Sequence, residues 1–134
     1  MRNLVGRLVE TACVKAEESN FSRLAYPDRI AAFFTTNAVL HLDGLGTDFS
    51  TISSRTDLLA AAMAARTQLR QAEFKLVDLN VTFPPEKGFA NAYAVITGEI
   101  NRQTNQFGQA FRLNLRKTGG RWLIDQVNTV ERVQ

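Results

Sequence analysis

Hydrophobic residues at the start of the chain recur at spacings of three and four residues. This apolar stripe runs from Leu4 to Ala16, and charged residues such as Arg7 fall outside it. The spacing is that of one face of a helix, so it predicts an amphipathic helix that ends near Ser19 and Asn20.

A second helix is predicted to begin at Pro27. Proline suits the first helical position because the N–H that it lacks would have no partner there. Asp28 follows, where a negative charge is favourable near the positive end of the helix dipole. The buried face of this helix is expected to comprise Ile30, Ala31, Phe33 and Phe34.

A short strand, Ala38–Asp43, is predicted next, followed by a loop that starts at Gly44. A third helix is expected to begin near Ser54, because Asp57 stands three residues later as the partner in a capping box. Its inner side is expected to comprise Leu58, Leu59, Ala62, Met63 and Leu69.

After Arg70 the pattern changes to an alternation of apolar and polar residues, which is typical of strands. Turn signals at Pro84–Gly88 and at Gly119–Gly120 divide it, and short connections imply an antiparallel meander. Helices followed by strands indicate the α+β class, in one domain that covers residues 1–134. The four predicted strands are Glu73–Phe83, Phe89–Asn101, Gln106–Lys117 and Arg121–Arg132.

Composition agrees with a globular domain, since 45% of the 134 residues are hydrophobic and 22% are charged. The net charge is +3 and the cations are scattered; only Arg112, Arg116, Lys117 and Arg121 approach a cluster. Basic residues at strand ends and a turn are typical of a solvated rim, so no nucleic-acid partner is expected.

No apolar run is long enough to span a bilayer, so no membrane partner is expected. Arg7, Glu10 and Lys15 interrupt the core that a signal peptide would need. A cytoplasmic location is therefore predicted, with export left open if a leader has been removed.

The chain has one cysteine, Cys13, and one histidine, His41. A single cysteine forms no intramolecular disulfide. The simplest interpretation of Cys13 is a structural role as a small buried hydrophobic residue. With no second His or Cys, no metal site is predicted, and no cofactor is predicted either.

The order helix, helix, short strand, helix and four-strand meander resembles the nuclear-transport-factor-2-like superfamily, which has the cystatin-like α+β fold. Relatives include ketosteroid isomerase, scytalone dehydratase and the SnoaL-like polyketide cyclases. Pro27–Leu40 (PDRIAAFFTTNAVL) resembles the family's second helix and first strand, and Arg116–Asp125 (RKTGGRWLID) resembles its last hairpin. The resemblance implies three helices packed on a strongly bent mixed or antiparallel sheet, as a conical barrel with an apolar internal cavity. It also implies a homodimer through the outer face of the sheet.

The resemblance does not carry over the isomerase's catalytic set. Leu42 matches the position of the family's aspartate base, and Asp43 lies one residue beyond it. The family's second acid falls near Arg112, and the first helix contains no tyrosine. Dehydratase chemistry uses paired histidines, whereas this chain has only His41. Asp43 and His41 remain the candidate catalytic residues, although a strand histidine with a structural role is the commoner case.

Two interpretations of the third strand of the predicted meander, Gln106–Lys117, remain open. Strand alternation points Phe111 toward the helices and Arg112 away from them, whereas the family match points Arg112 into the cavity. Gln126 and Asn128 follow Trp122 in parity, so they are expected to line the cavity mouth or to be exposed at an edge. The predicted ligand pocket comprises Phe33, Phe34, Leu59, Met63, Phe111, Trp122, Gln126 and Asn128.

Two functions therefore stand as hypotheses. The first is a domain that binds a small apolar or cyclic ligand, with or without isomerase, cyclase or dehydratase activity of the SnoaL-like kind. The second is a non-catalytic interaction module that forms a homodimer. A carboxylate or His41 inside the cavity favours the first, and a cavity filled by Phe33, Phe34, Met63 and Trp122 favours the second.

Overall fold

The helices lie mostly in the first half of the chain and the strands mostly in the second, as the sequence pattern predicts. A computed structural model describes residues 2–13, 20–42, 51–68, 71–100 and 106–130. In these ranges the elements run in the order α1 (Arg2–Ala12), α2 (Asn20–Ala31), β1 (Phe34–His41), β2 (Thr51–Ile52), α3 (Arg55–Gln68), β3 (Ala72–Thr82), β4 (Phe89–Ile100), β5 (Gln106–Thr118) and β6 (Arg121–Val130).

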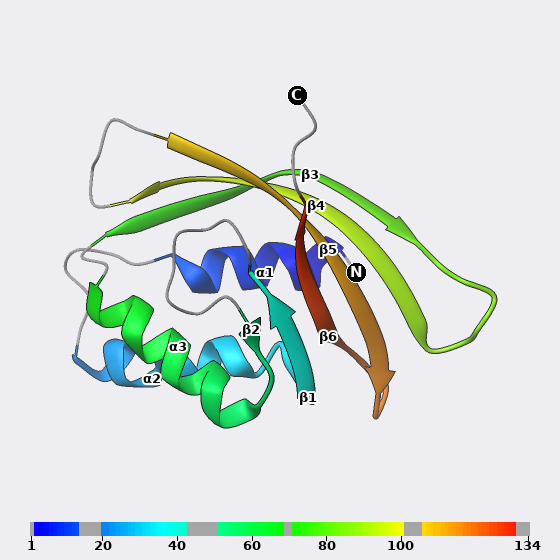
Figure 1. Ribbon diagram of the computed structural model, residues 1–134, viewed down its shortest axis with the longest axis horizontal. Coiled ribbons are helices and arrows are strands. Elements are labelled where there is room, and N and C mark those ends of the chain that lie inside the picture. Colours follow the sequence, from blue (N-terminus) through cyan, green and yellow to red (C-terminus); the bar gives the residue numbers. More distant parts are fainter. Residues whose placement is uncertain (1, 14–19, 43–50, 69–70, 101–105, 131–134) are drawn as a thin grey trace.

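The strands form one mixed sheet in the order β2-β1-β6-β5-β4-β3. All neighbours are antiparallel except β1 and β6, which run parallel, so the predicted meander of β3 to β6 is confirmed. The sequence analysis placed Thr51–Ile52 in a loop and missed β2. The predicted strong bend into a conical barrel is wrong, because the sheet is neither closed nor strongly curled and ends at β2 and β3 (Figure 1).

The glycine pair between β5 and β6 makes the tight turn that the sequence predicts. Gly119 and Gly120 have φ values of 58° and 79°, the left-handed region that glycine adopts without a steric penalty. Two left-handed residues in succession give a turn whose twist matches that of the flanking strands. This turn sets the register in which Thr118 faces Arg121.

The start of α3 is also as predicted. The amide of Asp57 donates to Ser54 Oγ at 3.1 Å, and the amide of Leu58 donates to the Ser54 carbonyl at 2.9 Å. Ser54 thus occupies the N-cap position. Arg55 donates to the carbonyls of Ala31 and Phe34, at 2.6 and 3.1 Å, and so ties α3 to the end of α2 and the start of β1.

Pro27 does not begin the second helix but lies inside α2, where its ring removes one backbone hydrogen bond. Tertiary contacts of its neighbour offset that loss. Tyr26 is 7% exposed and its hydroxyl donates to the Ala12 carbonyl at 2.9 Å, at the end of α1. The α1 helix ends at Ala12, and Cys13 is not part of it; residues 14–19, over which the sequence predicts that this helix continues, lie outside the described residues.

The prediction that Phe33 and Phe34 belong to the buried face of the second helix is wrong, because α2 ends before them. Phe34 opens β1 opposite Ile124, and the Ile124 amide donates to the Phe33 carbonyl at 2.8 Å. The strand therefore begins four residues before the predicted Ala38. A phenylalanine pair fits a helix or a strand equally well by hydrophobicity alone, and only the pairing with β6 decides between them.

The core lies between the helices and one face of the sheet. Its fully buried side chains include Val5 of α1, Leu115 of β5 and Ile124 of β6. Figure 1 shows all three helices on this side of the strands, with the β3–β4 hairpin projecting beyond them. Met63, predicted for the inner side of α3, is 46% exposed, and Leu69 lies outside the described residues.

Candidate functional site

The sheet has two faces of opposite character, which we call inner and outer. The inner face points toward the helices and carries the buried Ala92, Ala94, Leu113 and Leu115. On the outer face of β5, Arg112, Asn114 and Arg116 are exposed. Arg112 therefore points away from the helices, as strand alternation predicts and against the family match.

A β-bulge in β6 changes the parity on which part of the predicted pocket rests. Leu115 faces Ile124, but Asn114 faces Gln126, so Asp125 is one extra residue in β6. The Thr35 hydroxyl donates to the Asp125 carboxylate at 2.7 Å. Ile124 and Val127 both point to the inner face as a result, and Gln126 and Asn128 point to the outer face.

The predicted pocket residues therefore do not meet at one site. Phe33 and Phe34 are buried in the core, Met63 is exposed on α3, and Gln126 and Asn128 lie on the other side of the sheet. Gln126 Oε1 accepts a hydrogen bond from Asn114 Nδ2 at 2.9 Å, which engages it on the outer face. The remaining three are half-buried and pack against the inner core: Leu59, Phe111 and Trp122.

Other half-buried apolar side chains share the inner face with Phe111. Leu4 and Leu8 of α1 pack against the same core from the helix side. Leu79 and Val81 of β3 do so from the sheet. Apolar side chains are therefore partly exposed on both layers.

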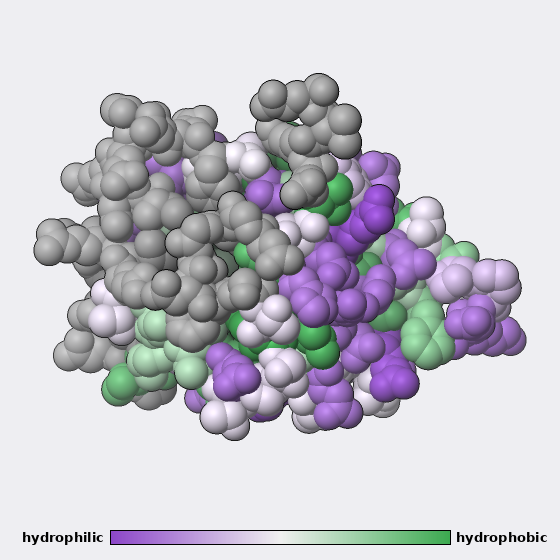
Figure 2. All heavy atoms as spheres, in the orientation of Figure 1, coloured by the Kyte–Doolittle hydropathy of each residue, from purple (hydrophilic) through white to green (hydrophobic). Residues whose placement is uncertain are grey.

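His41 lies on the outer face, within a row of residues that crosses all six strands. It faces Thr51 of β2 and Asn128 of β6. Figure 2 shows hydrophilic side chains gathered over the region where β5 and β6 run in Figure 1. The full row of directly opposed residues is Thr51, His41, Asn128, Arg112, Tyr93 and Asn80.

No carboxylate whose side chain is described points from a strand into the inner face. Asp78 is exposed beside the bulge in β3, and Glu99 faces Glu73 on the outer face of β4. Asp125 is engaged by Thr35. Asp43, the candidate base, lies outside the described residues.

Among the described residues, no group of three or more His, Cys, Asp or Glu side chains could hold a metal ion. Cys13 is half-buried beside the edge of the sheet. Its Sγ lies 3.4 Å from the Phe74 amide and 3.7 Å from the Phe74 carbonyl, so it fills backbone hydrogen bonds that β3 leaves open. No described helix is long and apolar enough to cross a membrane.

The sequence analysis missed two features, one at the end of β3 and one at the start of α3. Phe83, 64% exposed at the end of β3, approaches Trp122 with ring centroids 6.2 Å apart. Arg55, not singled out in the sequence, joins α2, β1 and α3. The signal for Phe83 was an apolar residue directly before two prolines, where no strand continues to bury it.

No family model and no curated protein sequence matches the chain. Solved structures do match over nearly its whole length. One is an NTF2-like (nuclear-transport-factor-2-like) protein of unknown function from Pseudomonas putida KT2440, with a TM-score of 0.75 and 14% identity, covering 99% of this chain and 84% of that one.

Two other similar structures have more specific descriptions. A candidate scytalone dehydratase from Novosphingobium aromaticivorans has a TM-score of 0.71 and 11% identity, over 99% of this chain and 86% of its own. A candidate calcium/calmodulin-dependent protein kinase II association domain from Xanthomonas campestris has a TM-score of 0.71 and 15% identity, over 98% and 86%.

Proposed function

Because the chain has the NTF2-like, or cystatin-like, fold, we propose that it binds a small apolar or cyclic molecule between the inner face of the sheet and the helices. The half-buried apolar side chains around Phe111 carry this proposal. Phe111 stands on the middle of β5, and Leu8 of α1 packs against the same core. Covering their remaining exposed surface with an apolar ligand removes it from water, which is favourable.

The chemistry of the inner face supports binding more than acid–base catalysis. His41 points outward, and no described carboxylate projects from a strand into the inner face. A proton-transfer base must come within hydrogen-bond reach of its substrate. Isomerase, cyclase or dehydratase activity is tested through Asp43, which follows β1 in the sequence. Asp43→Asn should abolish turnover of any substrate found. Unchanged turnover would contradict the assignment of Asp43 as the catalytic base.

The single tryptophan gives a direct test of binding. Trp122 packs against the inner core, so its fluorescence should change as N-phenylnaphthylamine, a neutral apolar probe, saturates a single site. Phe111→Ala should weaken binding about tenfold or more, because a buried phenylalanine contributes roughly 1.5–3 kcal/mol.

Tyr93→Ala is the matched control for this test. Tyr93 is also an aromatic residue of the central strands, but it lies on the outer face opposite Arg112 and is 37% exposed. It should leave the affinity for the probe unchanged. Equal losses in Phe111→Ala and Tyr93→Ala, or probe binding without saturation, would contradict an inner-face site.

A second candidate function is the non-catalytic module that forms a homodimer through the outer face. The polar row supports it, because Arg112, Asn128 and Tyr93 offer hydrogen-bond donors and acceptors to a second copy. Burial of Phe33 and Phe34 in the core also favours it, because their rings fill space between the sheet and the helices that a ligand would need. Sedimentation at micromolar concentration should then show a dimer that Arg112→Glu dissociates, and a monomeric wild type would contradict it.

A further inference from the structure

The end of the sheet farthest from α2 and α3 carries exposed aromatic and cationic side chains together. It consists of the β3–β4 turn, Phe83–Phe89, and the β5–β6 turn, Arg116–Trp122, and we call it the hairpin tip. The amide of Lys117 donates to the Gly88 carbonyl at 2.8 Å, so the two turns are joined. In Figure 1 the β3–β4 turn projects beyond every helix.

Two phenylalanines flank the projecting turn and remain open to solvent. Phe83 is 64% exposed and Phe89 is 40% exposed. A single exposed apolar side chain is ordinary on a surface, whereas several exposed apolar side chains gathered in one patch mark an interaction site. Pro84 and Pro85 keep the backbone between the two phenylalanines out of any strand. Strand pairing of the turn therefore cannot bury either ring.

Cations lie beside two aromatic rings of the tip, those of Phe89 and Trp122. The Arg116 guanidinium lies 5.7 Å from the centroid of the Phe89 ring, and Lys117 Nζ lies 6.0 Å from that of Trp122. Lys87 and Arg121 are exposed in the two turns, and Glu86 is the carboxylate of the tip. No ion pair to these four cations occurs within the described part of the chain.

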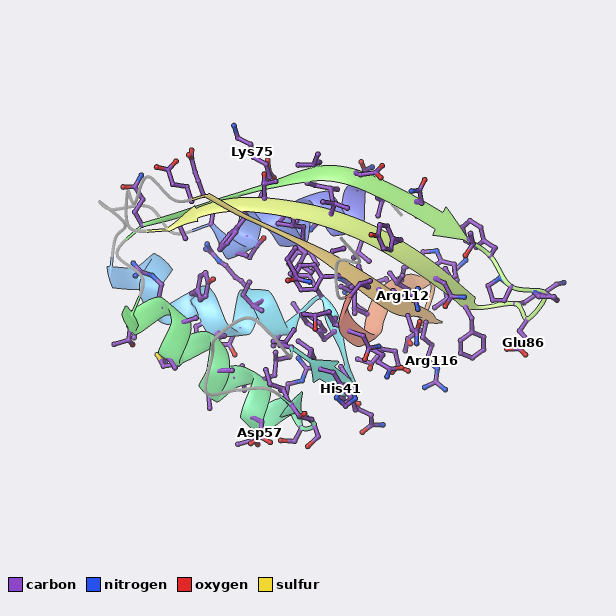
Figure 3. The ribbon with its side chains drawn as sticks, turned by 45° about the horizontal axis from the view of Figure 1, so that its top comes forward. His41, Asp57, Lys75, Glu86, Arg112 and Arg116 are labelled. Atoms are coloured by element: carbon purple, nitrogen blue, oxygen red, sulfur yellow. The ribbon has the colours of Figure 1, made fainter. Side chains whose placement is uncertain are left out.

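Four cations against one carboxylate give the tip a net positive charge. Lys75, in contrast, stands toward the other end of β3 near Glu73 and faces Thr97 (Figure 3). Figure 3 also places Glu86 and Arg116 at the same end of the sheet, and Figure 2 shows hydrophobic and hydrophilic side chains mixed there.

We propose that the hairpin tip docks on an anionic phospholipid surface, with Phe83 and Phe89 at the level of the headgroups and the cations against their phosphates and carboxylates. Aromatic rings favour the membrane–water boundary, and lysine or arginine beside them is attracted to anionic lipid. This is attachment to a bilayer surface rather than a membrane span. It explains why exposed rings and cations occur together on a part that projects.

A projecting turn favours a lipid surface over an extended polymer. Single-stranded nucleic acid binds in a basic groove with aromatic side chains stacked along it. Here the aromatics divide between the two faces, since Phe89 lies on the outer face with Arg116 while Trp122 lies on the inner face. A bilayer surface that meets the tip end-on can contact side chains of both faces of the sheet at once. A single nucleic-acid strand that lies in a groove on one face cannot.

Flotation of the full chain with vesicles tests the proposal. The chain should bind vesicles of equal parts phosphatidylcholine and phosphatidylserine, should not bind phosphatidylcholine alone, and should be released by salt, which screens surface charge. Trp122 emission should shift to shorter wavelength on binding. The Phe83→Ser, Phe89→Ser double variant should lose about tenfold or more in partitioning, because both apolar anchors are removed.

A matched pair of lysines separates the tip from net charge. Lys87→Gln and Lys75→Gln remove the same charge from exposed sites in different places. Lys87→Gln should reduce partitioning about fivefold, since one cation near an anionic surface contributes roughly 1 kcal/mol. Lys75→Gln should leave it unchanged. Far-ultraviolet circular dichroism checks that all variants are folded.

Each other outcome overturns the proposal. Equal binding to neutral vesicles would show that the cations do not direct docking. Equal losses for Lys87→Gln and Lys75→Gln would reduce the effect to net charge. Binding of an oligothymidine strand or of polyglutamate, with no binding to vesicles, would assign the tip to nucleic acid or to an acidic protein. Loss of the inner-face probe site in Phe111→Ala leaves the flotation result unaffected, because Phe111 lies outside the tip and flotation does not depend on the fluorescence of Trp122, which both tests use.

Discussion

Strands β5 and β6 are neighbours in the sheet, yet only β5 keeps a regular alternation through its middle. From Phe111 to Arg116 every second side chain of β5 points to the core. In β6, Asp125 is an extra residue, and every side chain after it changes face relative to a regular strand. This one bulge therefore decides that Gln126 and Asn128 point to the outer face of the sheet. It also decides which residues of β6 could line a ligand site on either face.

The largest expected effect comes from deleting one residue of each strand. Deleting Asn114 from β5 would point the following residues to the wrong faces, exposing leucine or burying arginine. We expect the free-energy cost of these misplaced side chains to exceed the typical stability of a domain, about 5–15 kcal/mol. Cooperative unfolding should therefore be lost. Deleting Asp125 removes the bulge and leaves Ile124 and Val127 on the inner face.

The Asp125 deletion should therefore still fold, at a cost of a few kcal/mol at most. Urea denaturation followed by circular dichroism measures both variants. A cooperative transition in the Asn114 deletion, or none in the Asp125 deletion, would contradict the bulge as the point at which β6 departs from β5.

Truncation of the inner face should have the next largest effect. Ile124 and Leu115 face each other and are 0% and 1% exposed. Ile124→Ala or Leu115→Ala should each destabilise the fold by about 2–5 kcal/mol, because the cavity that is left cannot close fully. Urea midpoints give the values, and a loss below about 1 kcal/mol would show that this core relaxes around the cavity.

The hydrogen bond that holds the bulge should contribute less. Thr35→Val or Asp125→Asn should each reduce the free energy of unfolding by about 1–2 kcal/mol. This is around the lower end of the values for a bond to a charged group, because both residues are half-exposed. The double variant should lose little more than either single one. Additive losses would mean that the two side chains act independently.

The turn that joins the two strands comes next. Gly120→Ala should cost about 1 kcal/mol, because φ at this position is 79° and a side chain resists the left-handed conformation. No atom would clash with the added methyl group, so backbone strain is the whole effect. Asn at position 120 should recover part of it, which thermal melting can detect, and an unchanged Gly120→Ala melting temperature would argue against the strain.

The smallest effect is expected for the outer pair. Asn114→Ala and Gln126→Ala remove the hydrogen bond between two side chains on the outer face, of which Asn114 is exposed, where water replaces the partner. Each should change stability by no more than about 0.5 kcal/mol. A larger loss, measured by the same urea titration, would show that the outer face is more buried in solution, as it would be in a homodimer.

Most of the fold could be predicted from local patterns. Alternation gave β3 to β6 almost to the residue, and the Ser54–Asp57 spacing gave the start of α3. The candidate site could not be predicted in the same way. Phe111 and Trp122 of the inner face and Leu59 of α3 pack against the same core, but Met63 is exposed, and Gln126 and Asn128 point to the outer face.

By itself, then, the sequence determined which segments become helices and strands in the second half of the chain, because period and turn chemistry are local properties. Only the tertiary structure decided where α2 begins, that Phe34 belongs to a strand, and which way β6 faces after Asp125. Each of these depends on a partner distant in sequence, such as the Ala12 carbonyl for Tyr26 or the Thr35 hydroxyl for Asp125. A residue's own neighbours along the chain carry no record of such contacts.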